Sequence, residues 1–141
     1  MSEQRGFLID THVWVWMAFG ETSRFSRKTM ARIEDAAQGG HLLLAAISLW
    51  EIAMFESKGR LSLGPSCSEW LKQAVRITGV TIAPLDIDIA AISCDLPGLH
   101  GDPADRQIVA SAIHHNAMLL TEDEGILEFA RKGEYRASRL K

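Results

Sequence analysis

The residues best suited to chemistry in this 141-residue chain are four acids that lie at the ends or starts of predicted elements. Asp10 directly follows one short hydrophobic run, and Asp123 lies just beyond another. Glu51 and Asp105 each occupy the first turn of a predicted helix. Acids gathered in one pocket repel each other, and some keep their protons unless a cation neutralises them. Mg²⁺ prefers oxygen ligands and couples to phosphates, so the four acids predict a Mg²⁺ or Mn²⁺ site acting on a phosphate.

Other metals and a broad nucleic-acid coat fit the composition poorly. The five histidines are scattered and the two cysteines, Cys67 and Cys94, are far apart, which argues against zinc and for reduced thiols in the cytoplasm. A net charge of −3 argues against a broad basic surface. It leaves nucleic-acid chemistry open, because a bound cation restores part of the missing positive charge.

Nothing in the chain predicts a membrane span or an export signal. No hydrophobic run approaches the ~20 residues of a membrane helix. The first six residues, Met1 to Gly6, lack a signal-peptide pattern. We therefore expect a cytoplasmic protein without a membrane partner.

The elements that must position the acids alternate along the chain. The hydrophobic segments predicted as buried strands are Phe7–Ile9, His41–Ala46, Val80–Ala83 and Ala117–Leu120. The segments predicted as helices are Val13–Phe19, Ser26–Ala37, Ser48–Ser57, Ser66–Arg76, Asp86–Cys94, Asp102–His115 and Glu124–Arg131. This alternation predicts one α/β domain, residues 1–141, with a parallel sheet covered on both faces.

Ligands bind outside the carboxyl ends of parallel strands, so the four acids are expected to share that edge. Each also has a structural interpretation. Glu51 completes a capping box that starts at Ser48, Asp102 is a typical N-cap, and Asp105 and Asp123 suit the positive end of a helix dipole. Asp10 is hardest to explain structurally, because a carboxylate directly after a buried strand needs a partner.

With these residues in place, the chain resembles the PIN-domain nucleases, specifically the VapC-type toxins of bacterial toxin–antitoxin pairs. The matching segments occur in the family's order and are Leu8–His12, Ser48–Ala53, Lys58–Leu61, His100–Arg106 and Leu119–Asp123. Ala104 departs from the pattern, since the commoner form of the motif has an aromatic residue there. This departure is expected to alter local packing more than metal binding.

The resemblance implies a three-layer α/β/α fold with a mainly parallel central sheet and endoribonuclease activity with Mg²⁺ or Mn²⁺. It also implies an RNA substrate, a homodimer, and an antitoxin protein that fills a groove beside the active site. The family's metal-binding and catalytic acids correspond to Asp10, Glu51, Asp105 and Asp123. Thr121 corresponds to the supporting hydroxyl, and Asp102 and Arg106 belong to the Asp-Pro-x-Asp-Arg form of the third motif.

Several residues near these motifs have less certain roles from sequence alone. Arg106 is expected to pair with a nearby acid or to touch the substrate, and a ligand role for His12 is disfavoured. Trp50 is expected in the core. Trp14 and Trp16 are two residues apart, so one of them should face a groove or a dimer contact.

Other function classes also fit parts of the pattern. A phosphatase-like hydrolase would use Asp10 as a nucleophile, but such enzymes often place a second Asp where His12 stands. A phospho-receiver module would need an acidic pair near the N-terminus, which this chain lacks. A non-catalytic interaction module on the same fold remains open if the pocket holds no metal.

Overall fold

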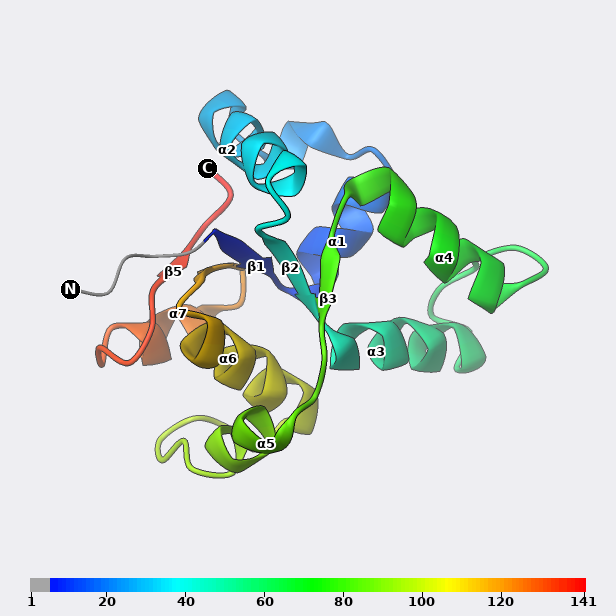
Figure 1. The fold of residues 1–141 in the computed structure, drawn as a ribbon. Coiled ribbons are helices and arrows are strands. Elements are labelled where there is room, and N and C mark those ends of the chain that lie inside the picture. The colour runs from blue at the N-terminus through cyan, green and yellow to red at the C-terminus, as the bar shows by residue number, and fades with distance from the viewer. Residues whose placement is uncertain (1–5) are drawn as a thin grey trace.

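A five-stranded, wholly parallel sheet forms the middle of the protein in the computed structural model, which describes residues 6–141 (Figure 1). The strands are β1 (Phe7–Ile9), β2 (Leu42–Ala45), β3 (Thr81–Ala83), β4 (Met118–Leu120) and β5 (Ala137–Ser138). Their order across the sheet is β3-β2-β1-β4-β5. The chain therefore builds outward from β1 in one direction and then returns to add β4 and β5 on its other side.

Helices cover both faces of this sheet (Figure 1). The helices are α1 (Thr11–Ala18), α2 (Arg27–Gln38), α3 (Ala46–Ser57), α4 (Cys67–Thr78), α5 (Ile87–Ser93), α6 (Pro103–His115) and α7 (Glu124–Ala130), with a short 3₁₀ turn η1 (Thr22–Arg24). No helix within residues 6–141 combines the length and hydrophobicity needed to cross a bilayer.

Alternating side chains of the strands divide the hydrophobic core in two. Phe7 and Ile9 of β1 pack with buried residues of α1 to α4, whereas Leu8 between them packs with α6 and α7. This is the alternation expected of a strand with both faces covered. The predicted three-layer α/β/α fold is confirmed.

Side-chain caps begin most of the helices where the sequence predicted them. Ser26 accepts the backbone N–H of Thr29, and Ser66 accepts that of Glu69. The predicted capping box at Ser48 is wrong. Because β2 runs directly into α3, that helix begins two residues earlier, at Ala46, and its first residues have no side-chain cap.

The fifth strand, β5, was not predicted from the sequence. It pairs with β4 through backbone hydrogen bonds from Leu119 to Arg136 and from Thr121 to Ser138. Leu140 is buried and accepts the backbone N–H of Ser26. A strand of two residues is too short to show a periodic pattern, so only the fold reveals it.

The tryptophans divide between core and surface in a way that partly contradicts the sequence analysis. Trp14 is fully buried, and its indole N–H donates to Thr78 at 2.9 Å. Trp16 is only partly buried, so one of the α1 pair does face outward, as predicted. Trp50 was expected in the core and is instead 56% exposed, because α3 turns it away from the sheet while its neighbour Ile52 points inward.

This difference predicts the stability of two variants. Trp14→Ala should lower the free energy of unfolding by about 3–5 kcal/mol, because it leaves a cavity and removes the hydrogen bond that the indole donates to Thr78. Trp50→Ala should cost less than about 1 kcal/mol, as most exposed substitutions do. Urea denaturation measures both, and similar losses for the two variants would contradict the burial described here.

Candidate metal centre

The four predicted acids meet at the carboxyl edge of the sheet, beside the ends of β1 and β4. Asp10, Glu51, Asp105 and Asp123 all line one open cavity of about 350 Å³. The cavity lies where the order of strands reverses, because β1 has β2 on one side and β4 on the other. This is the position at which open α/β sheets bind ligands. Folding therefore brings together all four acids that the sequence singled out.

Asp10 is the most deeply placed of the acids and is held at both oxygens. The backbone N–H of Thr11 donates to its Oδ1 at 2.8 Å, so that Asp10 caps α1. The hydroxyl of Thr121 donates to its Oδ2 at 2.7 Å and accepts the backbone N–H of Asp123 at 3.0 Å. Thr121 is fully buried. It thus ties the end of β1 to the loop that carries Asp123.

His12 also contacts both Asp10 and the loop after β4. Its Nε2 accepts the backbone N–H of Glu122 at 3.1 Å, and its Nδ1 lies 3.6 Å from Oδ2 of Asp10. Because Nε2 accepts a hydrogen bond, the neutral ring carries its proton on Nδ1, which faces Asp10. His12 therefore connects Asp10 to the loop after β4.

Glu51 forms the wall of the cavity contributed by α3. The hydroxyl of Thr11 donates to its Oε1 at 2.5 Å and lies 2.7 Å from the hydroxyl of Ser48. Burial raises the pKa of Glu51, the Thr11 hydrogen bond opposes that change, and the charge of Asp10 adds to it. The sequence analysis assigned no such role to Thr11 or Ser48. In the sequence Thr11 only follows Asp10, and Ser48 only has the pattern of a helix cap.

The carboxyl group of Asp105 lies partly buried among the other acids of the cavity. Burial, followed by the charges of Asp10, Asp102 and Asp123, raises the pKa of Asp105 to about 7. Glu51 makes a smaller contribution in the same direction. So high a pKa shows that no positive charge within residues 6–141 offsets the effects of burial and of the neighbouring acids on this carboxyl group.

Asp102 and Asp123 both act as N-caps. Asp102 begins α6, and its Oδ1 accepts the backbone N–H groups of Ala104 at 2.9 Å and Asp105 at 3.2 Å. Asp123 begins α7 and accepts the backbone N–H of Ile126 at 2.9 Å. Asp123 and Asp105, which lies in the first turn of α6, both line the cavity, so both helices begin beside it. The cap thus fixes where Asp105 emerges from α6.

Arg106 fastens the loop that precedes α6, a contact different from those proposed from the sequence. Its guanidinium donates to backbone carbonyls at distances of 2.8–3.5 Å, those of Ser93, Leu96, Leu99 and His100. It forms no ion pair with an acid within residues 6–141, so the expected acidic partner is wrong. The side chain takes the carbonyls because the end of α5 and the following loop leave them without helical partners.

His100 lies beside two of the cavity's acids, although the sequence analysis gave it no role. Its Nε2 lies 3.3 Å from Oδ2 of Asp105. Donor atoms of His100, Asp105 and Asp123 all lie within 4.8 Å of one another. In the sequence it stands at the start of the matching segment His100–Arg106, two residues before Asp102.

The donor groups fit a hard divalent ion. Carboxylates at the end of β1 and on α3, α6 and α7 line one cavity, where burial and then the neighbouring charges raise the pKa of Asp105. Mg²⁺ and Mn²⁺ both prefer such oxygen ligands. Asp105 and Asp123 bring ligand atoms within 4.8 Å of each other, and Asp10 and Glu51 line the same cavity.

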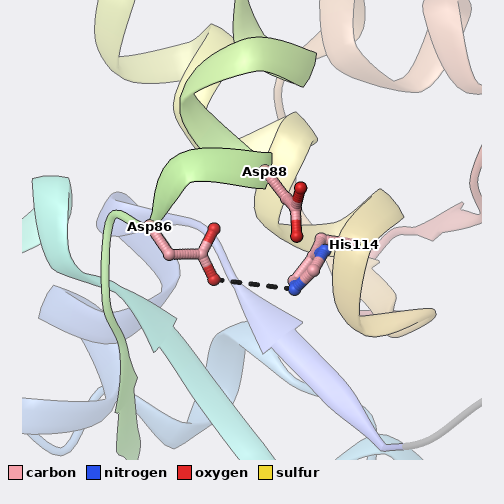
Figure 2. Close-up of side chains that lie close together, drawn as sticks. All are labelled: Asp86, Asp88 and His114. Carbon is pink, nitrogen blue, oxygen red and sulfur yellow. Dashed lines mark ion pairs between the residues drawn. The ribbon is translucent and has the colours of Figure 1, made fainter.

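A second group of acids and a histidine lies outside this cavity, at the ends of α5 and α6 (Figure 2). Asp86 caps α5 through its Oδ1, and its Oδ2 lies 3.6 Å from Nε2 of His114. Asp88 lies in the first turn of the same helix. All three side chains are exposed, and a cap together with an ion pair accounts for them.

The raised pKa of Asp105 predicts how the metal-free protein responds to pH. In the unfolded chain this group should titrate near 3.8, and in the folded chain near 7. Between these values the folded state binds more protons, so the free energy of unfolding contributed by Asp105 falls as pH rises from about 4 to 7. In EDTA at pH 8, Asp105→Asn should therefore melt above the wild type, and the gap should narrow toward pH 4.

Thermal melts between pH 4 and 8 measure this difference, with the exposed Asp35→Asn as the matched control. Mn²⁺ at pH 8 should raise the melting temperature of the wild type and leave that of Asp105→Asn nearly unchanged. A wild type that is more stable than Asp105→Asn in EDTA at pH 8 would contradict the prediction that the charged Asp105 carboxylate destabilises the metal-free fold.

Comparisons with known proteins agree with this geometry. Ribonuclease VapC22 of Mycobacterium tuberculosis is 38% identical over 120 residues, which covers 82% of this chain and 85% of that protein. VapBC2 of Rickettsia felis, solved with a DNA fragment from its promoter, shares the fold with a TM-score of 0.71 at 17% identity and covers 96% of this chain and 98% of its own. DNA-bound VapBC of Salmonella typhimurium has a TM-score of 0.67 at 17% identity, with 96% and 98% coverage.

FitAcB of Neisseria gonorrhoeae is a more distant structural neighbour, with a TM-score of 0.58 at 20% identity over 93% of this chain and 95% of its own. The family model described as the PIN domain matches residues 7–132, which include all four acids of the cavity. The sheet order, the position of the cavity and this match lead to one conclusion. The chain belongs to the PIN-domain family.

Proposed function

We propose that this chain is a divalent-metal-dependent endoribonuclease and the toxin of a toxin–antitoxin pair. The observation that carries the proposal is the convergence of Asp10, Glu51, Asp105 and Asp123 on one cavity at the carboxyl edge of the sheet. Membership of the PIN-domain family and the 38% identity to a ribonuclease support RNA as the substrate. Mg²⁺ and Mn²⁺ are the ions that the oxygen donors favour.

Within this proposal, the acids bind metal and the residues behind them hold the acids in place. The bound ion supplies positive charge that activates water and stabilises the phosphate during hydrolysis. Asp10 would hold it from β1, and the hydrogen bonds from Thr11 and Thr121 keep that carboxylate from rotating. Asp105 and Asp123 would hold it from the starts of α6 and α7. No residue forms a covalent bond with the substrate.

The phosphatase-like alternative fits the geometry less well. Such enzymes often place a second Asp two residues after the nucleophile. Here that position is His12, whose Nε2 accepts the backbone N–H of Glu122 and whose Nδ1 lies 3.6 Å from Asp10. The non-catalytic alternative predicts a cavity that binds no metal, and the metal experiment below tests it directly.

The cavity also supports an antitoxin as partner. Beside the acids its wall is hydrophobic, formed by Val15, Trp16, Phe55 and Leu61. A peptide that places apolar side chains on this wall and a basic side chain among the acids would block the site. Two structural neighbours are VapBC assemblies, which also supports such a partner.

We further propose a cytoplasmic homodimer, for which exposed hydrophobic residues such as Trp50 offer contact surface.

Asp10→Asn provides the sharpest test of the function. The variant keeps the cap on α1 and loses a charged metal ligand, so RNA cleavage should fall at least about 100-fold while the fold persists. Cleavage of total RNA by the purified chain measures this, as does growth arrest when the chain is expressed alone. EDTA should stop cleavage by the wild type, and Mg²⁺ or Mn²⁺ should restore it.

The matched control is Asp35→Asn, which removes the same charge from an exposed position on α2. It should cleave RNA like the wild type. Activity retained in Asp10→Asn, or cleavage that continues in EDTA, would refute a metal-dependent nuclease at this cavity. A wild-type chain that binds no Mn²⁺ and cuts no RNA would favour the interaction module.

A further inference from the structure

The loop before α6 places the imidazole of His100 3.3 Å from the carboxylate of Asp105, one of the acids that line the cavity. We propose that His100 is a positioning residue that orients the carboxylate of Asp105 through its Nε2 without itself binding the metal. The inference rests on the proposed function, because it concerns how the same cavity holds its ion. Three features of the structure support it.

The first feature is the hydrogen-bond partner of each ring nitrogen. Nδ1 of His100 accepts the backbone N–H of Asp102 at 3.4 Å. A neutral ring with an accepting Nδ1 carries its proton on Nε2, and Nε2 lies 3.3 Å from Oδ2 of Asp105. A metal-binding histidine shows the reverse arrangement, in which the second nitrogen donates its N–H to an oxygen. His100 is therefore arranged to hold a carboxylate.

The second feature is the support given to the loop that carries His100. Arg106 donates to the carbonyls of Leu99 and His100, at 3.0 and 3.3 Å. Arg106 directly follows Asp105 in α6, and Asp102 caps the same helix. The loop, the cap and the carboxylate are thus fastened to one another, so the imidazole has a fixed place relative to Asp105.

The third feature is the space kept for the ring at the start of α7. A Cβ added to Gly125 would lie 3.3 Å from Cδ2 of His100 and 3.2 Å from Oδ1 of Asp123. Both distances are closer than ordinary packing allows, so the glycine leaves room for the imidazole beside Asp123. The His100 side chain is 42% exposed, and packing in the core does not explain its position.

These contacts matter because Asp105 has little else to orient it. Within residues 6–141, His100 is the one ion-pair partner described for the Asp105 carboxylate. Groups that orient metal ligands from behind typically change metal affinity by roughly 10- to 100-fold when removed. Loss of His100 should therefore weaken metal binding even though no metal ligand is lost.

The test measures Mn²⁺ affinity of the full metal-free chain from the electron paramagnetic resonance signal of free Mn²⁺. His100→Ala should weaken affinity roughly 10-fold or more. His100→Gln should recover most of the loss, because its amide nitrogen reaches the place of Nε2. His100→Asn should not recover it, because its shorter amide reaches only the place of Nδ1.

The chain offers a matched control in His114→Ala. His114 lies at the other end of α6 and pairs with Asp86 at 3.6 Å, outside the cavity (Figure 2). This variant should bind Mn²⁺ like the wild type. Thermal melts of all variants show whether a weaker affinity reflects the site or a loss of folded protein.

Pulsed paramagnetic resonance of the Mn²⁺-bound chain separates positioning from direct binding. A nitrogen coupling that disappears in His100→Ala would show that His100 is a ligand and would overturn the proposal. Equal affinities for wild type and His100→Ala would overturn it too, as would a folded His100→Gln as weak as His100→Ala. A wild-type chain that binds no Mn²⁺ would refute the proposed function itself. If the wild type binds Mn²⁺ and cleaves RNA, and His100→Ala does both equally well, only the inference about His100 is refuted.

Discussion

Repulsion among carboxylates confined to one edge of the sheet is the constraint to which the surrounding structure responds. The pKa of Asp105 is raised to about 7 by burial and by the neighbouring acids, and burial also raises that of Glu51. Hydrogen bonds offset part of the cost at Asp10, which accepts from Thr11 and from Thr121. The remaining repulsion would be relieved by a divalent cation, which the proposed function requires.

Helix starts give these acids a second use. Asp10 caps α1, Asp102 caps α6 and Asp123 caps α7, so the structural and functional interpretations of these residues are not exclusive. A cap orients the carboxylate toward the exposed N–H groups of the first turn, and the helix dipole favours its negative charge. Parallel strands send every following helix back from the same edge. Acids that cap helices at this edge of the sheet therefore lie close together, although they are far apart in the sequence.

The hydrophobic segments and capping residues were enough to predict the order of elements, the parallel sheet and the candidate acids. Errors arose where local pattern and tertiary contact disagree. Ser48 has the pattern of a cap, yet it lies inside α3 and its hydroxyl faces Thr11. Trp50 has a hydrophobic side chain, yet no element covers it. The fifth strand is two residues long and depends entirely on pairing with β4.

The sequence by itself determined which acids stand at the ends and starts of strands and helices, because strand and helix patterns depend on neighbouring residues. Only the tertiary structure decided which groups hold those acids in place. Thr121 meets Asp10 across 111 positions of the chain, and Arg106 finds its carbonyl partners in a loop without regular structure. Such contacts leave no periodic trace in the sequence. They follow from the packing of whole elements, which fixes distances between residues that are far apart in the chain.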